Sequence, residues 1–154
     1  MIGSAGADAG ALPPVARQLT VERPGAEAFA AFAEQIGQWW PSDFTASGEN
    51  LADVTIEPKE GGRVYETNNQ GKEYDWGSVL TYEPGQRVVL SWTLGLDGGS
   101  PTEVEAVFTG DDERCEVAFE HRGFDADQEM DRMKFDDEGG WNVVLEDYIA
   151  YAER

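Results

Sequence analysis

The sequence predicts an α+β domain in which a curved antiparallel sheet of six to seven strands wraps around a long C-terminal helix. Three observations lead to this fold class. Apolar and polar residues alternate through the middle of the chain, which is typical of strands with one buried and one wet face. Short turns rich in Gly, Pro and Asn separate these runs. Residues 141–154 then change to a helical period.

Two elements precede the middle strands. Residues 15–21 alternate well enough for a strand. Pro24 and Gly25 then begin a helix, which Gly37 ends. The apolar residues of the strand share one face: Val15, Leu19 and Val21. Those of the helix recur at helical spacing: Phe29, Phe32, Ala33 and Ile36. Residues 39–50 are expected to form a loop or an irregular helical turn.

Six strands are expected in the middle of the chain. They lie near residues 54–56, 63–67, 74–82, 88–94, 103–108 and 115–122. In the third of them we assign the even-numbered residues to the inner face: Tyr74, Trp76, Ser78, Leu80 and Tyr82. In the last, the inner face carries Cys115, Val117, Phe119 and His121.

A long helix is expected to cover the apolar face of the sheet. Its apolar residues fall on one helical face: Trp141, Val144, Leu145, Tyr148 and Ala152. The acidic run 125–138 before it is interpreted as a solvated helical or loop segment that closes over the sheet. A helix lying in the concavity of a sheet leaves a space between them, and small apolar ligands bind in such spaces.

Charge excludes several kinds of partner. The chain has 31 Asp plus Glu against 11 Lys plus Arg, which gives a formal net charge of −20. Such an acidic protein repels phosphate backbones and anionic lipid, so we expect neither nucleic-acid binding nor membrane insertion. Cys115 is the only cysteine, so no intrachain disulfide can form.

Residues 15–154 are predicted to form a single domain, preceded by a flexible N-terminal tail over residues 1–14. The tail is rich in Gly and Ala but lacks the basic start and the apolar run of a signal peptide. We therefore expect a cytoplasmic protein.

The chain of 154 residues contains five tryptophans, which is many because a buried indole is bulky and its N–H needs a partner. They come from separate segments: Trp39, Trp40, Trp76, Trp92 and Trp141. They either fill the core or line a cavity for an apolar or aromatic ligand. Adjacent residues cannot easily both point inward. One of the pair Trp39 and Trp40 is therefore expected to plug the cavity, and the other to pack at the surface.

His121 is the only histidine and ends the inward face of the last strand. It is either a general base or polar anchor in an apolar pocket, or a histidine satisfied by its neighbours in a structural role. One His and one Cys without close spacing cannot make a usual zinc site. Pairs of carboxylates carry no information in so acidic a chain. We therefore predict no catalytic residue, no metal site and no cofactor.

Several stretches spread over residues 15–154 are similar to one known family. They are Trp39-Trp40-Pro41, Ile56-Glu57-Pro58, Gly61-Gly62-Arg63-Val64-Tyr65-Glu66, Gly71-Lys72-Glu73, Trp76-Gly77-Ser78-Val79-Leu80, Tyr82-Glu83-Pro84, residues 87–92, His121-Arg122-Gly123-Phe124, and Gly140-Trp141 with Val144-Leu145. Their order and spacing resemble the START-like (SRPBCC) superfamily, in particular its bacterial branch named after the activator of the heat-shock-protein-90 ATPase. The resemblance implies a helix-grip fold with a deep hydrophobic cavity. It implies no single activity, because the superfamily includes lipid carriers, hormone receptors, aromatase/cyclases and chaperone activators.

We predict a small binding protein for a hydrophobic or aromatic molecule, such as a lipid or a flat ring compound, held between the sheet and the C-terminal helix. The expected ligand-binding residues are Trp40, Phe44, Trp76, Trp92, Phe108, Phe119, His121 and Trp141. Two alternatives stay open: a cyclase- or hydratase-like enzyme that uses His121, and a co-chaperone that acts on a heat-shock ATPase. The expected oligomeric state is a monomer or a weak dimer.

Overall fold

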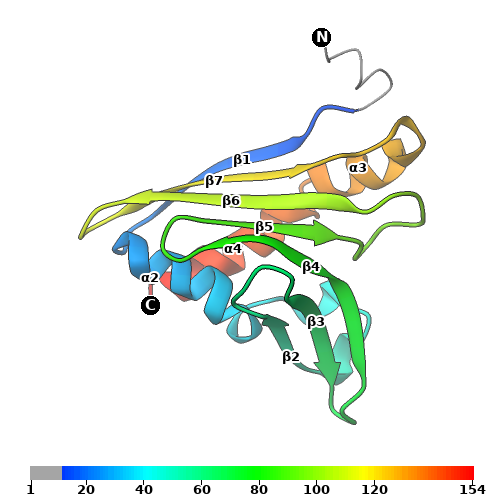
Figure 1. Cartoon of the computed structure of the whole chain (residues 1–154), viewed down its shortest axis with the longest axis horizontal. Coiled ribbons are helices and arrows are strands. Elements are labelled where there is room, and N and C mark those ends of the chain that lie inside the picture. The colour runs from blue at the N-terminus through cyan, green and yellow to red at the C-terminus, as the bar shows by residue number, and fades with distance from the viewer. Residues whose placement is uncertain (1–11) are drawn as a thin grey trace.

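Seven antiparallel strands form one curled sheet in the computed structural model, which describes residues 12–154 (Figure 1). Their order across the sheet is β1-β7-β6-β5-β4-β3-β2, so β1 pairs with the last strand of the chain. The strands are β1 (Val15–Val21), β2 (Leu51–Ile56), β3 (Arg63–Asn68), β4 (Glu73–Glu83), β5 (Arg87–Trp92), β6 (Thr102–Gly110) and β7 (Cys115–Arg122). The predicted α+β fold and its curved antiparallel sheet are confirmed.

The C-terminal helix α4 (Trp141–Ala152) packs on the inner side of the sheet, as its apolar stripe predicts (Figure 1). Its buried residues are Trp141, Val144, Leu145 and Tyr148. The hydroxyl of Tyr148 donates a hydrogen bond of 2.7 Å to the carbonyl oxygen of Ala28, in the short helix α2 (Gly25–Phe29). The two helices therefore cover neighbouring parts of the same apolar face.

The helix expected to run from Gly25 to Gly37 is interrupted. Beyond α2 the chain widens into a π-helical turn over Ala30–Glu34 and then tightens into a 3₁₀ turn over Ile36–Gln38. A Cβ atom on Gly37 would lie 2.9 Å from the backbone oxygen of Val54, so glycine allows this segment to approach β2 closely. These changes of helical pitch turn the chain so that Trp39 and Trp40 both enter the interior.

The expected inner face of β4 is wrong between Trp76 and Tyr82. The pairing of β4 shifts by one residue against β3 and again against β5, which marks two β-bulges. Each bulge reverses which side chains point inward. Trp76 faces the core as expected. After it, Val79, which was expected to face outward, is buried, and Leu80, which was expected to face inward, is 43% exposed. Tyr82 faces inward again and packs edge-to-face on Phe29, with ring centroids 5.5 Å apart.

The N-terminal tail was expected to extend to residue 14, but residues 12–14 contact the domain. The backbone N–H of Leu12 donates to the carbonyl oxygen of Phe124, 3.0 Å away, and the guanidinium of Arg132 donates to the carbonyl oxygens of Pro13 and Pro14. The expectation for residues 1–11 lies outside the described residues. Within residues 12–154, no helix is long and apolar enough to span a membrane.

The acidic run 125–138 folds into a 3₁₀ turn over Ala126–Gln128 followed by the helix α3 (Glu129–Asp136). A capping box begins this segment, because Asp125 and Gln128 bond to each other's backbone N–H groups. Two further side chains tie α3 to residues 95–98. Asp131 accepts from the backbone N–H of Asp97 at 3.1 Å, and Nζ of Lys134 donates to the carbonyl oxygen of Gly95 at 2.9 Å.

Gly77 offers a test of how closely β4 approaches β5. A Cβ atom on Gly77 would lie 1.8 Å from the backbone oxygen of Ser91 in β5, a distance that no side chain can accept. We expect Gly77→Ala to lower the free energy of unfolding by about 1–3 kcal/mol or more, since the strands must separate locally. Urea denaturation measures the effect.

The matched control is Gly139→Ala. Gly139 has no atom within 4 Å of a built Cβ and does not have a positive φ. Its substitution should leave stability within about 0.5 kcal/mol of the parent. Equal stabilities of the two variants would contradict the close approach at Gly77.

Candidate ligand-binding cavity

Trp39 and Trp40 are both buried, with 7% and 8% of their surfaces exposed, so the expectation that one packs at the surface is wrong. Their rings point to different parts of the interior. Trp39 packs on Phe32 and Tyr148, and its Nε1 donates to the carbonyl oxygen of Ala31 at 2.7 Å. The two indoles also pack on each other, with ring centroids 5.8 Å apart.

The ring of Trp40 lies at the centre of a group of four indoles. Its centroid is 4.9 Å from that of Trp76, 5.8 Å from that of Trp92 and 6.0 Å from that of Trp141. The centroids of Trp92 and Trp141 are 5.5 Å apart. These spacings are those of favourable tilted and edge-to-face aromatic pairs. The loop, the sheet and α4 are therefore joined through one aromatic cluster.

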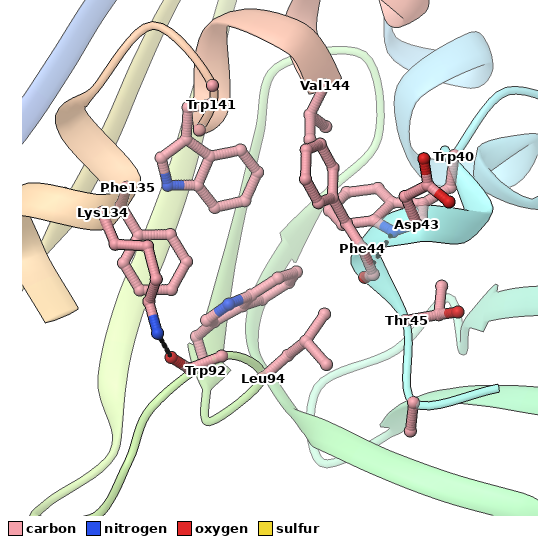
Figure 2. A pocket seen from close by; sticks show the side chains of 14 residues that line it. Trp40, Asp43, Phe44, Thr45, Trp92, Leu94, Lys134, Phe135, Trp141 and Val144 are labelled. Atoms are coloured by element: carbon pink, nitrogen blue, oxygen red, sulfur yellow. Dashed lines mark hydrogen bonds between the residues drawn. The ribbon is translucent and has the colours of Figure 1, made fainter. Parts of the chain in front are cut away.

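A cavity of about 360 Å³ opens beside this cluster (Figure 2). Four segments supply its walls: residues 40–46 of the loop, residues 92–95 at the end of β5, residues 134–135 of α3, and residues 139–144 at the start of α4. The large side chains in the wall are Trp40, Phe44, Trp92, Leu94, Phe135, Trp141 and Val144. Cavities that bind small ligands are typically about 300–1,000 Å³ and mostly apolar, so this one lies within the usual range.

Few polar groups face the cavity. Asp43 and Lys134 line it from different segments, as Figure 2 shows. Lys134 is already engaged, since it donates to the carbonyl oxygen of Gly95 and forms an ion pair with Asp131 at 3.5 Å. Trp40 donates its Nε1–H to the carbonyl oxygen of Phe44 at 3.1 Å, which fixes the loop wall. The cavity thus presents aromatic surface with few charges.

The fixed position of this loop also depends on Glu66, a fully buried carboxylate in β3. Its two oxygens accept hydrogen bonds from the backbone N–H groups of Ala46 and Ser47 and from Nε1 of Trp76, at 2.7–2.8 Å. Burial alone would raise the pKa of Glu66, but the hydrogen bonds from Ser47, Ala46 and Trp76 outweigh it and lower the pKa. Glu66 is therefore an anion that holds the cavity wall to the sheet.

His121 lies behind the cavity wall and is fully buried. Its Nδ1 accepts from Nε1 of Trp141 at 2.9 Å, so in the neutral ring the proton is on Nε2. Nε2 lies 2.7 Å from Oγ1 of Thr102, and that hydroxyl donates to the carbonyl oxygen of Trp92 at 3.0 Å. Burial lowers the pKa of His121 to about 3. His121 is a neutral link between α4 and the sheet, with both ring nitrogens bonded.

The eight expected ligand-binding residues divide into two groups. Four line the cavity: Trp40, Phe44, Trp92 and Trp141. The other four are buried and do not line it: Trp76, Phe108, Phe119 and His121. Of these, Phe108 packs on Phe29 and Phe32 beside α2, whereas Phe119 packs on Trp141 with centroids 4.7 Å apart. This second group supports the wall or fills the core.

Several wall residues were not selected from the sequence, among them Leu94, Phe135 and Val144. Phe135 had a usable signal, because it is the one aromatic residue in the acidic run 125–138. A ring in an otherwise solvated helix needs an apolar partner. The ring of Phe135 stacks on that of Trp141, with centroids 6.0 Å apart. Within residues 12–154, no group of three or more His, Cys, Asp or Glu is arranged to hold a metal ion.

The fold and the cavity together define a START-like (SRPBCC) protein, a class whose members bind small molecules in a cavity. Within it, the model of the family described as "Activator of Hsp90 ATPase homolog 1-like protein" matches residues 23–152, and the chain belongs to this family. A comparison with curated proteins gives no significant match.

Solved structures similar to this chain share its fold. CalC of Micromonospora echinospora, a self-sacrificing resistance protein, is 26% identical with a TM-score of 0.67, over 91% of this chain and 94% of CalC. Protein MLL2253 of Mesorhizobium loti is 19% identical with a TM-score of 0.67, over 90% of this chain and 95% of that one. Txn09, an anthrahydroquino-γ-pyrone synthase, is 22% identical with a TM-score of 0.56, over 93% and 98%.

The pH dependence of stability tests the environment of His121. Its pKa falls from 6.5 to about 3 on folding, so between these values the unfolded chain binds a proton that the folded protein does not. The stability is therefore complete above pH 6.5 and decreases as the pH falls. In the parent, the free energy of unfolding should lose up to about 1.4 kcal/mol per pH unit below that point from His121 alone.

His121→Gln removes this titration while keeping a donor and an acceptor. Urea denaturation between pH 7 and 5.5, above the range where most carboxylates titrate, should show a shallower slope in the variant than in the parent. The chain has no second histidine to mask the difference. Parallel slopes would mean that His121 is not held neutral by burial.

Proposed function

We propose that this protein binds a flat hydrophobic or aromatic small molecule in the cavity between the loop 40–46, the end of β5, α3 and α4. The observation that carries the proposal is a 360 Å³ cavity whose walls are mostly aromatic and aliphatic. A flat ring in contact with several indoles gains both burial and ring–ring contact.

Hydrogen bonds and ring contacts hold several wall side chains in place. Trp40 is bonded to Phe44 and Trp141 to His121, and the centroids of Trp92 and Trp141 are 5.5 Å apart. A pre-formed apolar wall costs little conformational entropy when a ligand enters. With about 25 cal/mol gained per Å² of apolar surface removed from water, a two- or three-ring compound is expected to bind with micromolar affinity.

The arrangement around His121 favours binding over acid–base catalysis. A general base should have its lone pair directed at a substrate and a pKa near the working pH. In His121 one nitrogen accepts from Trp141, the other bonds to Thr102, and the pKa is about 3. The family's name refers to an ATPase activator, but the proposal rests on the cavity and not on that name.

Filling the cavity tests the proposal. Val144 lines the wall from α4 and is buried, so Val144→Phe places a ring in the space that the ligand would occupy. We expect the parent to bind the apolar dye N-phenylnaphthylamine with micromolar affinity and to show quenched tryptophan fluorescence. The variant should bind at least about ten-fold more weakly, because the volume is lost.

Val143→Phe is the matched control, since Val143 is the preceding residue of the same helix and does not line the cavity. It should bind the dye like the parent. Both variants are compared after urea denaturation has shown that they are folded. Equal binding by parent, Val144→Phe and Val143→Phe would place the dye elsewhere and refute the proposal for this cavity.

A screen for turnover tests whether His121 catalyses a reaction. Aromatic polyketide-like compounds and epoxides are incubated with the parent and with His121→Gln, and products are followed by chromatography. We expect no turnover that depends on His121, because both of its ring nitrogens are bonded within the protein. A turnover that disappears in the variant would make His121 a catalytic residue.

A further inference from the structure

The indole N–H of Trp92 has no hydrogen-bond partner, although the side chain is 2% exposed and the atom itself is buried. The other four tryptophans all donate: Trp39 to Ala31, Trp40 to Phe44, Trp76 to Glu66 and Trp141 to His121. Trp92, whose N–H is unpaired, also lines the cavity. Buried donors are almost always paired, so this exception requires a reason.

The ring of Trp92 is not free to turn toward another acceptor. It lies between Trp40, Trp76 and Trp141, with centroids 5.5–5.8 Å away. Its carbonyl oxygen is held by the hydroxyl of Thr102. Leaving a buried donor unpaired costs about 1–3 kcal/mol, and a ligand that supplies an acceptor recovers part of that cost.

We propose that the ligand is an uncharged aromatic carbonyl compound, a ketone or quinone, whose oxygen accepts a hydrogen bond from Nε1 of Trp92. This inference rests on the proposed function and names the chemical class that the cavity selects. An indole nitrogen is a donor only, so its complement is a group that only accepts. A hydroxyl would bring a proton that itself needs a partner in an apolar wall.

The charges around the cavity argue against an anionic acceptor. Lys134 is paired with Asp131 and bonded to Gly95, and Asp43 lines another part of the wall. A carboxylate would lose its hydration in an apolar cavity without gaining a free cation, in a protein of net charge −20. A neutral carbonyl loses much less hydration free energy on entering the cavity. Nε1 is buried in this structure, so the proposal requires a wall side chain to shift on binding and open the nitrogen to the cavity, as side chains commonly do when a ligand binds.

The experiment compares fluorenone with fluorene, which have the same three rings and differ in the carbonyl. Affinities are measured for the parent and for Trp92→Phe, which keeps an aromatic ring and removes the donor. The two compounds partition differently into any apolar site, so the quantity to compare is the fluorenone-to-fluorene affinity ratio. We expect that ratio to fall about five- to ten-fold in Trp92→Phe relative to the parent.

Trp39→Phe is the matched control, because Trp39 does not line the cavity and its N–H is bonded to the carbonyl oxygen of Ala31. Its affinity ratio should equal that of the parent. A direct readout is the Nε1–H resonance of Trp92 in ¹⁵N-labelled parent protein, assigned by standard NMR methods. It should move downfield with fluorenone and much less with fluorene, and this measurement does not require the variant to fold.

The outcomes separate this inference from the proposed function. If neither compound binds the parent, the cavity is not a binding site and both proposals are wrong. If both compounds bind while the ratio is the same in Trp92→Phe and the resonance responds equally to both, the cavity binds aromatics but Trp92 does not select a carbonyl. A reduced ratio with the selective downfield shift supports the inference.

Discussion

The interior of this protein is organised by the need of buried indole N–H groups for partners. Trp141 begins α4, and its bond to His121 fixes the start of the helix against the end of β7. Trp76 bonds to Glu66, which in turn holds the backbone of Ala46 and Ser47. Each of these bonds joins segments that are distant in sequence. Helix, sheet and loop are therefore positioned by directional polar contacts inside an apolar cluster, and not by hydrophobic burial alone.

Regular alternation allowed the strands and α4 to be predicted from the sequence. From β5 to β7 the pairing contains no shift, so residues that alternate in sequence also alternate in space. In β4 the alternation continues in the sequence, but two bulges change the inward face. A bulge depends on how the neighbouring strands fit together, and no single strand carries that information.

The candidate site was harder to predict for a related reason. Periodicity indicates which side chains face inward but not how deeply they lie. Phe108 and Phe119 face inward in mid-strand, where α2 and α4 cover them. Trp92 faces inward at the end of its strand, where the cavity begins. Lys134 and Phe135 belong to a segment whose acidic composition suggested solvent exposure, and only the packing of α3 brings them to the wall.

The cavity walls come largely from segments outside the hydrogen-bonded ladder of the sheet (Figure 2). The wall side chains Phe44, Leu94, Phe135 and Val144 make no hydrogen bond to the sheet, so they can be replaced without breaking a bond between strands. Selection for a new ligand can therefore act on one set of positions while selection for foldability acts on another. The sheet and its buried His121 can stay constant while the shape of the cavity diverges, which makes this protein an adaptable starting point for evolving or engineering recognition.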